Sequence, residues 1–221
     1  MEPAFRVVEL VGLPPFKLWF NWSFEGLERI PREGPVLVAA NHISYLDPVA
    51  HAYFLHARGR RARFLAKSEL FDVPVFGGLM RNAGQIPVQR ATGDQDALGH
   101  ARDALAGGEA VVVYPEGTVT HDPSFLPMRA KTGIVRLSLS SGVPITPVAV
   151  WGAQHVWQKS GPGSLAFGRP IWMASAEAID LSEWGRRDVD GEVLRSLTDD
   201  VMERLSRLVA GLRARYPARW S

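Results

Sequence analysis

The chain has 221 residues, of which 46% are hydrophobic and 22% charged, a composition typical of one folded domain with a sizeable core. Its net charge of +2 is too small to indicate a nucleic-acid partner, and we expect none. The lack of cysteine excludes disulfides, thiolate nucleophiles and cysteine-based metal sites. No run approaches about 18 uninterrupted apolar residues and the N-terminus lacks a signal-peptide pattern, so we expect neither a transmembrane helix nor a leader.

The N-terminal segment, residues 1–25, is rich in aromatic side chains and carries a pair of prolines. Because Pro14 and Pro15 would break a single helix, residues 5–24 are predicted to form two short amphipathic helices. Tryptophan, phenylalanine and lysine occur together in 16–24, and this combination suits a membrane interface. A helical hairpin that covers the core is the alternative, and one segment can serve both roles.

From residue 35 onward, short apolar runs alternate with helical patterns. The predicted strands are 35–40, 63–67, 85–90, 110–114, 144–150 and 171–173. The predicted helices are 49–55, 74–82, 94–106, 133–140 and 190–215. This alternation indicates an α/β fold with a mixed, largely parallel sheet flanked by helices. We divide a single domain, 1–221, into N-terminal membrane-interface helices (1–25), an α/β core (26–175) and a C-terminal helical segment (176–221).

His42 and Asp47 lie in the turn between the strand at 35–40 and the helix at 49–55. Asp47 followed by Pro48 is typical of a helix N-cap and first helical position. In one continuous helix the two side chains would point about 140° apart, so a contact requires the chain to turn between them. A carboxylate on one imidazole nitrogen leaves the other nitrogen available as a base. The pair is therefore a candidate general base with its orienting carboxylate.

Two further strand ends carry anion-binding or reactive side chains. Arg90 ends the strand at 85–90, and the polar turn at 116–118 follows the strand at 110–114. In α/β sheets, polar loops at strand ends build the site. We therefore expect these loops and the turn with His42 to form one site.

Four sequence blocks occur in order along the chain. They are NHISYLD at 41–47, GQIPVQR at 84–90, YPEGT at 114–118 and VPITPV at 143–148, with FLAKSEL at 64–70 between the first two. Together they resemble the blocks of glycerolipid acyltransferases of the lysophosphatidate acyltransferase (PlsC-like) type, and the similarity spans 26–152. Tyr114 stands where that family usually has phenylalanine, Gln89 where aspartate is frequent, and Val119 where arginine is common. Arg129 or Lys131 could supply the missing phosphate contact.

The resemblance implies transfer of a fatty acyl group from acyl-CoA or acyl-carrier protein to the free hydroxyl of lysophosphatidate, giving phosphatidate in phospholipid biosynthesis. His42 would deprotonate the hydroxyl and Asp47 would orient and support His42, a role that suits an imidazole near neutral pH. We expect no cofactor and no metal, and a peripheral or monotopic location at the cytoplasmic face of the cell membrane. Backbone N–H groups of the 116–118 turn, or of the helix start after Asp47, are the candidate oxyanion donors.

The resemblance also implies a set of residues that bind the acceptor. Arg90 would bind its phosphate through paired hydrogen bonds, and Lys67 would add positive charge nearby. Gly117 and Thr118 belong to the same set. Glu116 would contact the acceptor's hydroxyls or orient Arg90, because a carboxylate repels phosphate.

Several alternatives remain open. The acceptor is alternatively glycerol 3-phosphate or another lysophospholipid. A non-catalytic lipid-binding protein on the same fold is a different class, although a protein without activity need not retain both His42 and Asp47. A metal-dependent hydrolase using the dyad and Glu116 is weaker, because the nearby histidines lack a recognised metal-ligand spacing. Within the enzyme class, acylation of Ser44 is the rival mechanism, and the resemblance disfavours it.

Overall fold

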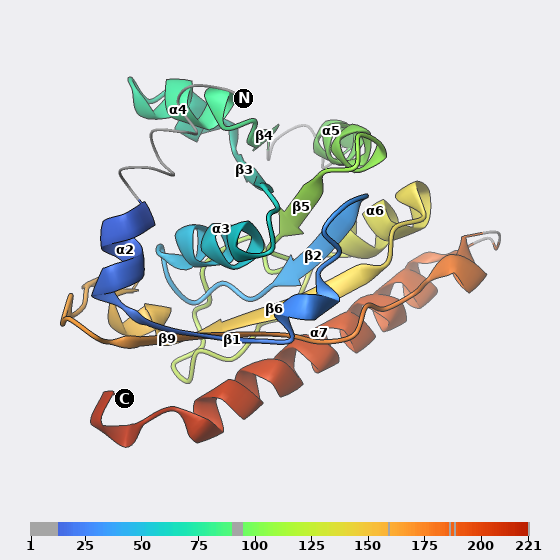
Figure 1. Ribbon diagram of the computed structural model, residues 1–221. Helices are drawn as coiled ribbons and strands as arrows, with labels where there is room; N and C mark the ends of the chain where they lie inside the picture. Colours follow the sequence, from blue (N-terminus) through green and yellow to red (C-terminus); the bar gives the residue numbers. More distant parts are fainter. Residues whose placement is uncertain (1–12, 90–94, 159, 186, 188, 221) are drawn as a thin grey trace.

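The computed structural model describes residues 13–89, 95–158, 160–185, 187 and 189–220 (Figure 1). Arg90 and residues 1–12, which are part of the predicted interfacial segment, lie outside these ranges. Within the described residues, no helix is both long enough and apolar enough to cross a bilayer.

One seven-stranded sheet runs through the described part of the chain, in the order β1-β9-β6-β2-β5-β3-β4. The strands are β1 (Asn21–Glu25), β2 (Val36–Ala40), β3 (Ala62–Lys67), β4 (Ile86–Val88), β5 (Ala110–Val113), β6 (Ile145–Trp151) and β9 (Pro170–Ser175). All neighbouring strands pair in parallel except β6 and β9. A short hairpin of β7 (Trp157–Gln158) and β8 (Gly161–Pro162) stands apart from this sheet. The predicted mixed, largely parallel sheet is confirmed.

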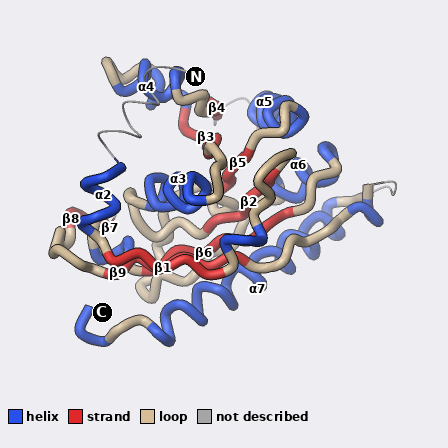
Figure 2. The backbone as a smooth tube through the Cα atoms, viewed as in Figure 1, coloured by secondary structure: helices blue, strands red, loops and turns tan. Residues whose placement is uncertain are grey.

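Helices cover both faces of the sheet, as the single layer of strands between helices in Figure 2 shows. The helices are α2 (Leu13–Trp19), α3 (Asp47–Ala57), α4 (Phe76–Asn82), α5 (Gln95–Ala106), α6 (Gly133–Ser141) and α7 (Gly191–Arg215). In β2, Val36 and Val38 share a core cluster with Phe54 of α3, whereas Leu37 and Ala39 pack with residues of α5, α6 and α7. Because β2 is buried on both faces, its sequence is a continuous apolar run instead of an alternating one.

The topology brings the predicted loops to one end of the sheet. After β2 the chain passes to β3 and β4 on one side, returns through β5, and then places β6 on the other side of β2. Connections that diverge in this way leave a crevice at the carboxyl ends of the central strands. The turn with His42 follows β2 and the 116–118 turn follows β5, so both lie at the carboxyl ends of these two neighbouring strands.

The prediction of two helices within 5–24 is wrong for residues 21–25, which form the edge strand β1. Trp22 and Phe24 alternate along β1, and both rings contact Tyr53 of α3. Aromatic residues suit strands as well as interfacial helices, and pairing with β9 decides between the two. Pro14 and Pro15 fall in the first turn of α2, where a helix needs no N–H group from them.

Candidate active site

His42 and Asp47 make the contact that their spacing predicts. β2 ends at Ala40, the chain turns, and α3 begins at Asp47. Oδ2 of Asp47 lies 2.9 Å from Nδ1 of His42 and also accepts the N–H groups of Ile43 and Ser44, at 2.6 and 2.7 Å. The prediction that Asp47 is a helix N-cap is wrong: Leu46 holds that position, and the carboxylate binds the turn that precedes the helix.

The contact with Asp47 determines which nitrogen of His42 can act as a base. The Asp47 side chain is fully buried, whereas the His42 side chain is 15% exposed. Because Nδ1 faces a carboxylate, we assign the ring proton to Nδ1, which leaves Nε2 as the basic atom. The arrangement can take a proton from a group that reaches the exposed edge of the ring.

The turn is held to its neighbours by two buried polar side chains. The amide of Asn41 donates to the Val150 carbonyl and accepts its N–H group, at 3.0 and 2.8 Å, which extends the β2–β6 pairing past Ala40. The hydroxyl of Ser44 donates to the Trp157 carbonyl at 2.6 Å and accepts the Leu46 N–H group. Because Ser44 is fully buried with its hydroxyl in these bonds, the geometry favours a structural role for it.

Glu116 braces the turn from the end of β5. One carboxylate oxygen accepts the His42 N–H group at 3.3 Å and the other accepts the Met128 N–H group at 2.9 Å. Burial raises the pKa of Glu116 from 4.5 to about 7, against the opposing effect of these two hydrogen bonds. The Thr120 N–H group donates to the His42 carbonyl at 2.7 Å, so both backbone groups of His42 are bound to the loop after β5.

The other predicted acceptor-binding residues lie in two places, the turn after β5 and the end of β3. Gly117 has a positive φ of 71° and its N–H group donates to the Tyr114 carbonyl, so this N–H group is engaged within the turn. Thr118 is half-buried beside it, and Lys67 is exposed at the end of β3. A Cβ atom at Gly117 would lie 3.6 Å from Cε of Lys131, so the Lys131 side chain runs along the turn.

Two residues that lie next to His42 and Asp47 have no function predicted from the sequence. The ring of Tyr114 stacks on the His42 ring, with centroids 4.2 Å apart and planes 20° from parallel. The Tyr114 hydroxyl lies 3.2 Å from Nδ1 of His51, which is buried in α3 and also lies 2.8 Å from the Asp47 carbonyl. The four-residue spacing of Asp47 and His51 is the one local signal that points to their contact, and Tyr114 could be found only from the tertiary structure.

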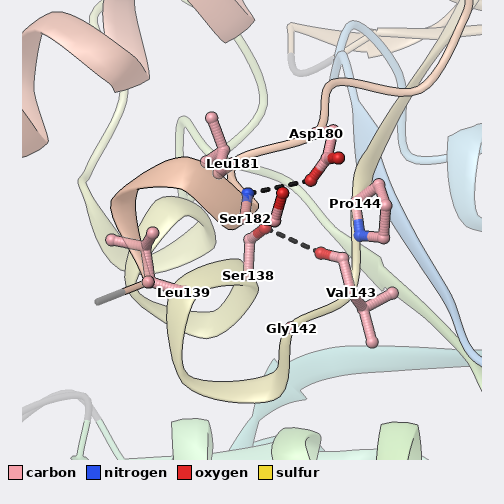
Figure 3. Close-up of a pocket in the computed structure, with 9 residues that line it drawn as sticks. Ser138, Leu139, Gly142, Val143, Pro144, Asp180, Leu181 and Ser182 are labelled. Carbon is pink, nitrogen blue, oxygen red and sulfur yellow. Dashed lines mark hydrogen bonds between the residues drawn. The ribbon is translucent and has the colours of Figure 1, made fainter. Parts of the chain in front are cut away.

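A separate hollow of about 310 Å³ lies at the opposite end of β6, between α6 and the segment 180–185 (Figure 3). Its polar groups bind one another: the Ser138 hydroxyl donates to the Val143 carbonyl, and the Ser182 N–H group donates to Asp180. It contains none of the predicted site residues. Among the described residues, no cluster of three or more histidine and acidic side chains could hold a metal ion.

Comparisons with known proteins identify a family and several relatives of this chain. A family model described as Acyltransferase matches residues 21–151. A chloroplastic 1-acyl-sn-glycerol-3-phosphate acyltransferase of Brassica napus is 27% identical over 76% of this chain and 49% of its own length. An uncharacterized protein of Mycobacterium tuberculosis is 29% identical over 90% of this chain and 64% of its own length. The chain thus spans about half to two thirds of these relatives.

A solved structure is similar over nearly the whole chain. The crystal structure of the 1-acyl-sn-glycerophosphate acyltransferase PlsC from Thermotoga maritima superposes with a TM-score of 0.70 at 25% sequence identity. The match covers 97% of this chain and 81% of that protein. The two proteins therefore share a fold over nearly the whole of this chain.

Proposed function

Because the chain belongs to the Acyltransferase family, we propose that it transfers a fatty acyl group from a thioester to the free hydroxyl of lysophosphatidate, giving phosphatidate. The observation that carries the proposal is the contact of His42 with the buried carboxylate of Asp47, within the matched residues. Several relatives are named for the acylation of 1-acyl-sn-glycerol 3-phosphate, which supports this choice of acceptor.

The reaction uses His42 as acid and base in turn. Nε2 takes the proton of the acceptor hydroxyl as its oxygen bonds to the thioester carbonyl carbon. The carbon–sulfur bond of the tetrahedral intermediate then breaks, and the thiolate takes the proton back from Nε2. The carboxylate of Asp47 stabilises the imidazolium that exists between these steps, at the 2.9 Å distance of its Oδ2 from Nδ1.

Cationic side chains at the carboxyl end of the sheet would bind the acceptor's phosphate. Arg90 remains the first candidate by resemblance, and Lys67 at the end of β3 would add positive charge. Val119, which stands where the family often has arginine, is buried. The position of Lys131 beside Gly117 favours this lysine as the replacement. Glu116 holds backbone groups through both oxygens, so its predicted contact with the acceptor would use their remaining lone pairs.

The acyl donor in this proposal is acyl-CoA or acyl-carrier protein, and the reaction needs no cofactor. Both donors present the same thioester, and the residues assigned in this proposal would contact the acceptor and not the thiol carrier. The direct mechanism is favoured over acylation of Ser44 because that hydroxyl is buried and donates to the Trp157 carbonyl.

An exposed apolar surface beside the turn supports membrane association. We call this surface the apolar rim; its residues are Leu18, Trp19, Tyr45, Trp157, Leu165 and Phe167. The indole of Trp19 donates to the Leu165 carbonyl and its ring contacts Phe167, while Tyr45 contacts Trp157. Such aromatic residues suit the headgroup region of a bilayer. We propose a peripheral or monotopic protein at the cytoplasmic face of the cell membrane.

The test of the proposed function compares His42→Ala with His100→Ala, an exposed histidine of α5 on the far face of the sheet. Free CoA released from acyl-CoA is measured with and without lysophosphatidate, and circular dichroism checks folding. We expect release only with the acceptor, a loss of about 10²- to 10⁴-fold in His42→Ala, and wild-type rates in His100→Ala.

The same assay distinguishes the alternatives. Substitution of glycerol 3-phosphate or other lysophospholipids for lysophosphatidate identifies the acceptor, and acyl-carrier protein substitutes for CoA to identify the donor. Activity that persists in a folded His42→Ala protein would refute the general-base role. A stable acyl adduct on Ser44 after incubation with acyl-CoA alone would refute direct transfer.

A further inference from the structure

The proposed chemistry leaves two residues next to His42 without a role, the half-buried Tyr114 and the buried His51. Tyr114, the first residue after β5, lays its ring on the imidazole with 4.2 Å between the ring centroids. This separation and the 20° angle between the planes correspond to stacking contact over much of the imidazole face. Rotation of the His42 ring about its Cβ–Cγ bond would drive it into the Tyr114 ring.

Tyr114 is itself held from two sides. Its hydroxyl lies 3.2 Å from Nδ1 of His51, and the Phe64 ring lies nearly parallel to its own at 6.1 Å. His51 is anchored one helical turn after Asp47, with Nδ1 2.8 Å from the Asp47 carbonyl. The Asp47 carbonyl can only accept, so Nδ1 of His51 carries the ring proton and shares it with the oxygen of the Tyr114 hydroxyl, which favours this one orientation of Tyr114.

The groups in this arrangement are neutral apart from the dyad and Glu116. Burial raises the pKa of Tyr114 well above its usual value, and burial lowers the pKa of His51. Neither group therefore carries a charge near neutral pH. Among the described residues, the titratable groups that contact His42 or Tyr114 are Asp47, His51 and Glu116, and the neutral His51 does not compete with His42 for the charge of Asp47.

We propose that Tyr114, anchored by His51, is a positioning residue for His42. The Tyr114 ring holds the plane of the imidazole so that Nδ1 stays on Asp47 and Nε2 stays aimed at the acceptor hydroxyl. The Tyr114 hydroxyl does not react; through His51 it fixes the orientation of the Tyr114 ring. This inference rests on the proposed general-base role of His42, but its first consequence, a single tautomer of the His42 ring, does not require substrate.

The first experiment is a ¹⁵N NMR measurement of the histidine rings in the full chain at about pH 8, above the usual pKa of a free imidazole. His42→Gln assigns the His42 signals. We expect one tautomer, with the proton on Nδ1, in the wild type and in Tyr114→Phe, and a mixture of both tautomers in Tyr114→Leu. Tyr216→Phe is the matched control, because the Tyr216 hydroxyl also forms a hydrogen bond, to the Pro170 carbonyl, and its ring also stacks on a histidine, His155.

The second experiment separates kcat from KM in the acyl-transfer assay. We expect Tyr114→Leu to lower kcat by about 30-fold with KM within about twofold of wild type, because only orientation of the base is lost. Tyr114→Phe and His51→Leu should each lower kcat by about threefold. The double variant should be no worse than the poorer single variant, because both substitutions remove the same contact, that between the Tyr114 hydroxyl and His51.

Two results would overturn the positioning role. One is an unchanged Nδ1–H tautomer in a folded Tyr114→Leu protein; the other is additive losses in the double variant. If Tyr114→Leu does not fold, the comparison of Tyr114→Phe, His51→Leu and their double variant still decides the question. If the tautomer of His42 changes in Tyr114→Leu but the wild-type protein shows no acyl transfer, the result supports the positioning of His42 and refutes the proposed function. The positioning role and the proposed function can therefore fail separately.

Discussion

At the residue scale, the site depends on carboxylates that bind backbone N–H groups. Asp47 accepts those of Ile43 and Ser44, and Glu116 accepts those of His42 and Met128. These bonds hold the turn in the shape that lets Asp47 reach the imidazole. Glu116 differs in that burial raises its pKa to about 7, so its charge changes near neutral pH.

The raised pKa of Glu116 predicts a pH-dependent contribution to stability. The folded protein keeps a proton that the unfolded chain releases between pH 4.5 and about 7, so this contribution to the free energy of unfolding falls as pH rises through that window. The fall is on the order of 3 kcal/mol, at about 1.4 kcal/mol for each pKa unit. The glutamine of Glu116→Gln cannot titrate, so the free energy of unfolding of this variant should lack this pH-dependent fall.

Urea unfolding of wild type and Glu116→Gln across this pH window checks the prediction. The free energy of unfolding of the wild type minus that of the variant should decrease as pH rises. Glu183→Gln, at an exposed position, is the control and should give a constant difference. A constant difference for Glu116→Gln as well would mean that the carboxyl group titrates alike in the folded and unfolded states.

At the scale of elements, the end of β2 is joined to β6 by a side chain. Asn41 forms two hydrogen bonds with the backbone of Val150 where the regular pairing of β2 and β6 has stopped. The two strands therefore remain together up to the residue before His42. These two hydrogen bonds therefore hold the start of the turn against the central sheet.

Asn41→Ala should destabilise the protein and slow the reaction together. It leaves the buried N–H and carbonyl groups of Val150 without their partner, at a cost of about 1–3 kcal/mol for each group left unpaired. Asn82→Ala, an exposed asparagine at the end of α4, serves as the control. Urea unfolding measures the stability, and amide hydrogen exchange at Val150 should rise only in Asn41→Ala. Unchanged exchange there would contradict the bridging role.

At the scale of the whole molecule, the apolar rim gathers segments that are far apart in the sequence. α2, the turn at Tyr45, the β7–β8 hairpin and the loop at 165–167 contribute to it. The Trp157 carbonyl accepts the Ser44 hydroxyl, so the rim is joined directly to the turn with His42. An enzyme that binds a bilayer through this rim would meet a lipid acceptor with its site close to the membrane surface.

Replacing Leu18 and Phe167 together by serine should weaken binding to vesicles that contain anionic phospholipid. These side chains are 73% and 70% exposed, so the change removes apolar contact with the bilayer and leaves the core intact. Leu126→Ser, at an exposed position outside the rim, is the control. Co-sedimentation measures binding. Equal binding of the double variant and wild type would reject the rim as the membrane-facing surface. Deleting residues 1–24 is a poorer test because it removes most of β1.

Much of the fold and the dyad could be predicted because the signals are local. The apolar run of β2, the turn and the start of α3 follow one another within a few residues, so a contact between His42 and Asp47 follows from the chain turning between them. β4 lies at the edge of the sheet, a position that suits Pro87 because proline cannot donate to a neighbouring strand. Residues 21–25 were mistaken for helix because their aromatic pattern suits two structures equally, and only pairing with β9 distinguishes them.

The sequence alone determined the α/β class and the His42–Asp47 pair, because each depends on periodicity or on spacing within one turn, and it predicted that the 116–118 turn lies beside this pair. Only the tertiary structure decided what surrounds that pair. Tyr114 reaches His42 and His51 from β5, Asn41 reaches Val150 on β6, and Glu116 holds the His42 backbone. These contacts join residues 63 to 109 positions apart, and strand order, which no local pattern encodes, places them together.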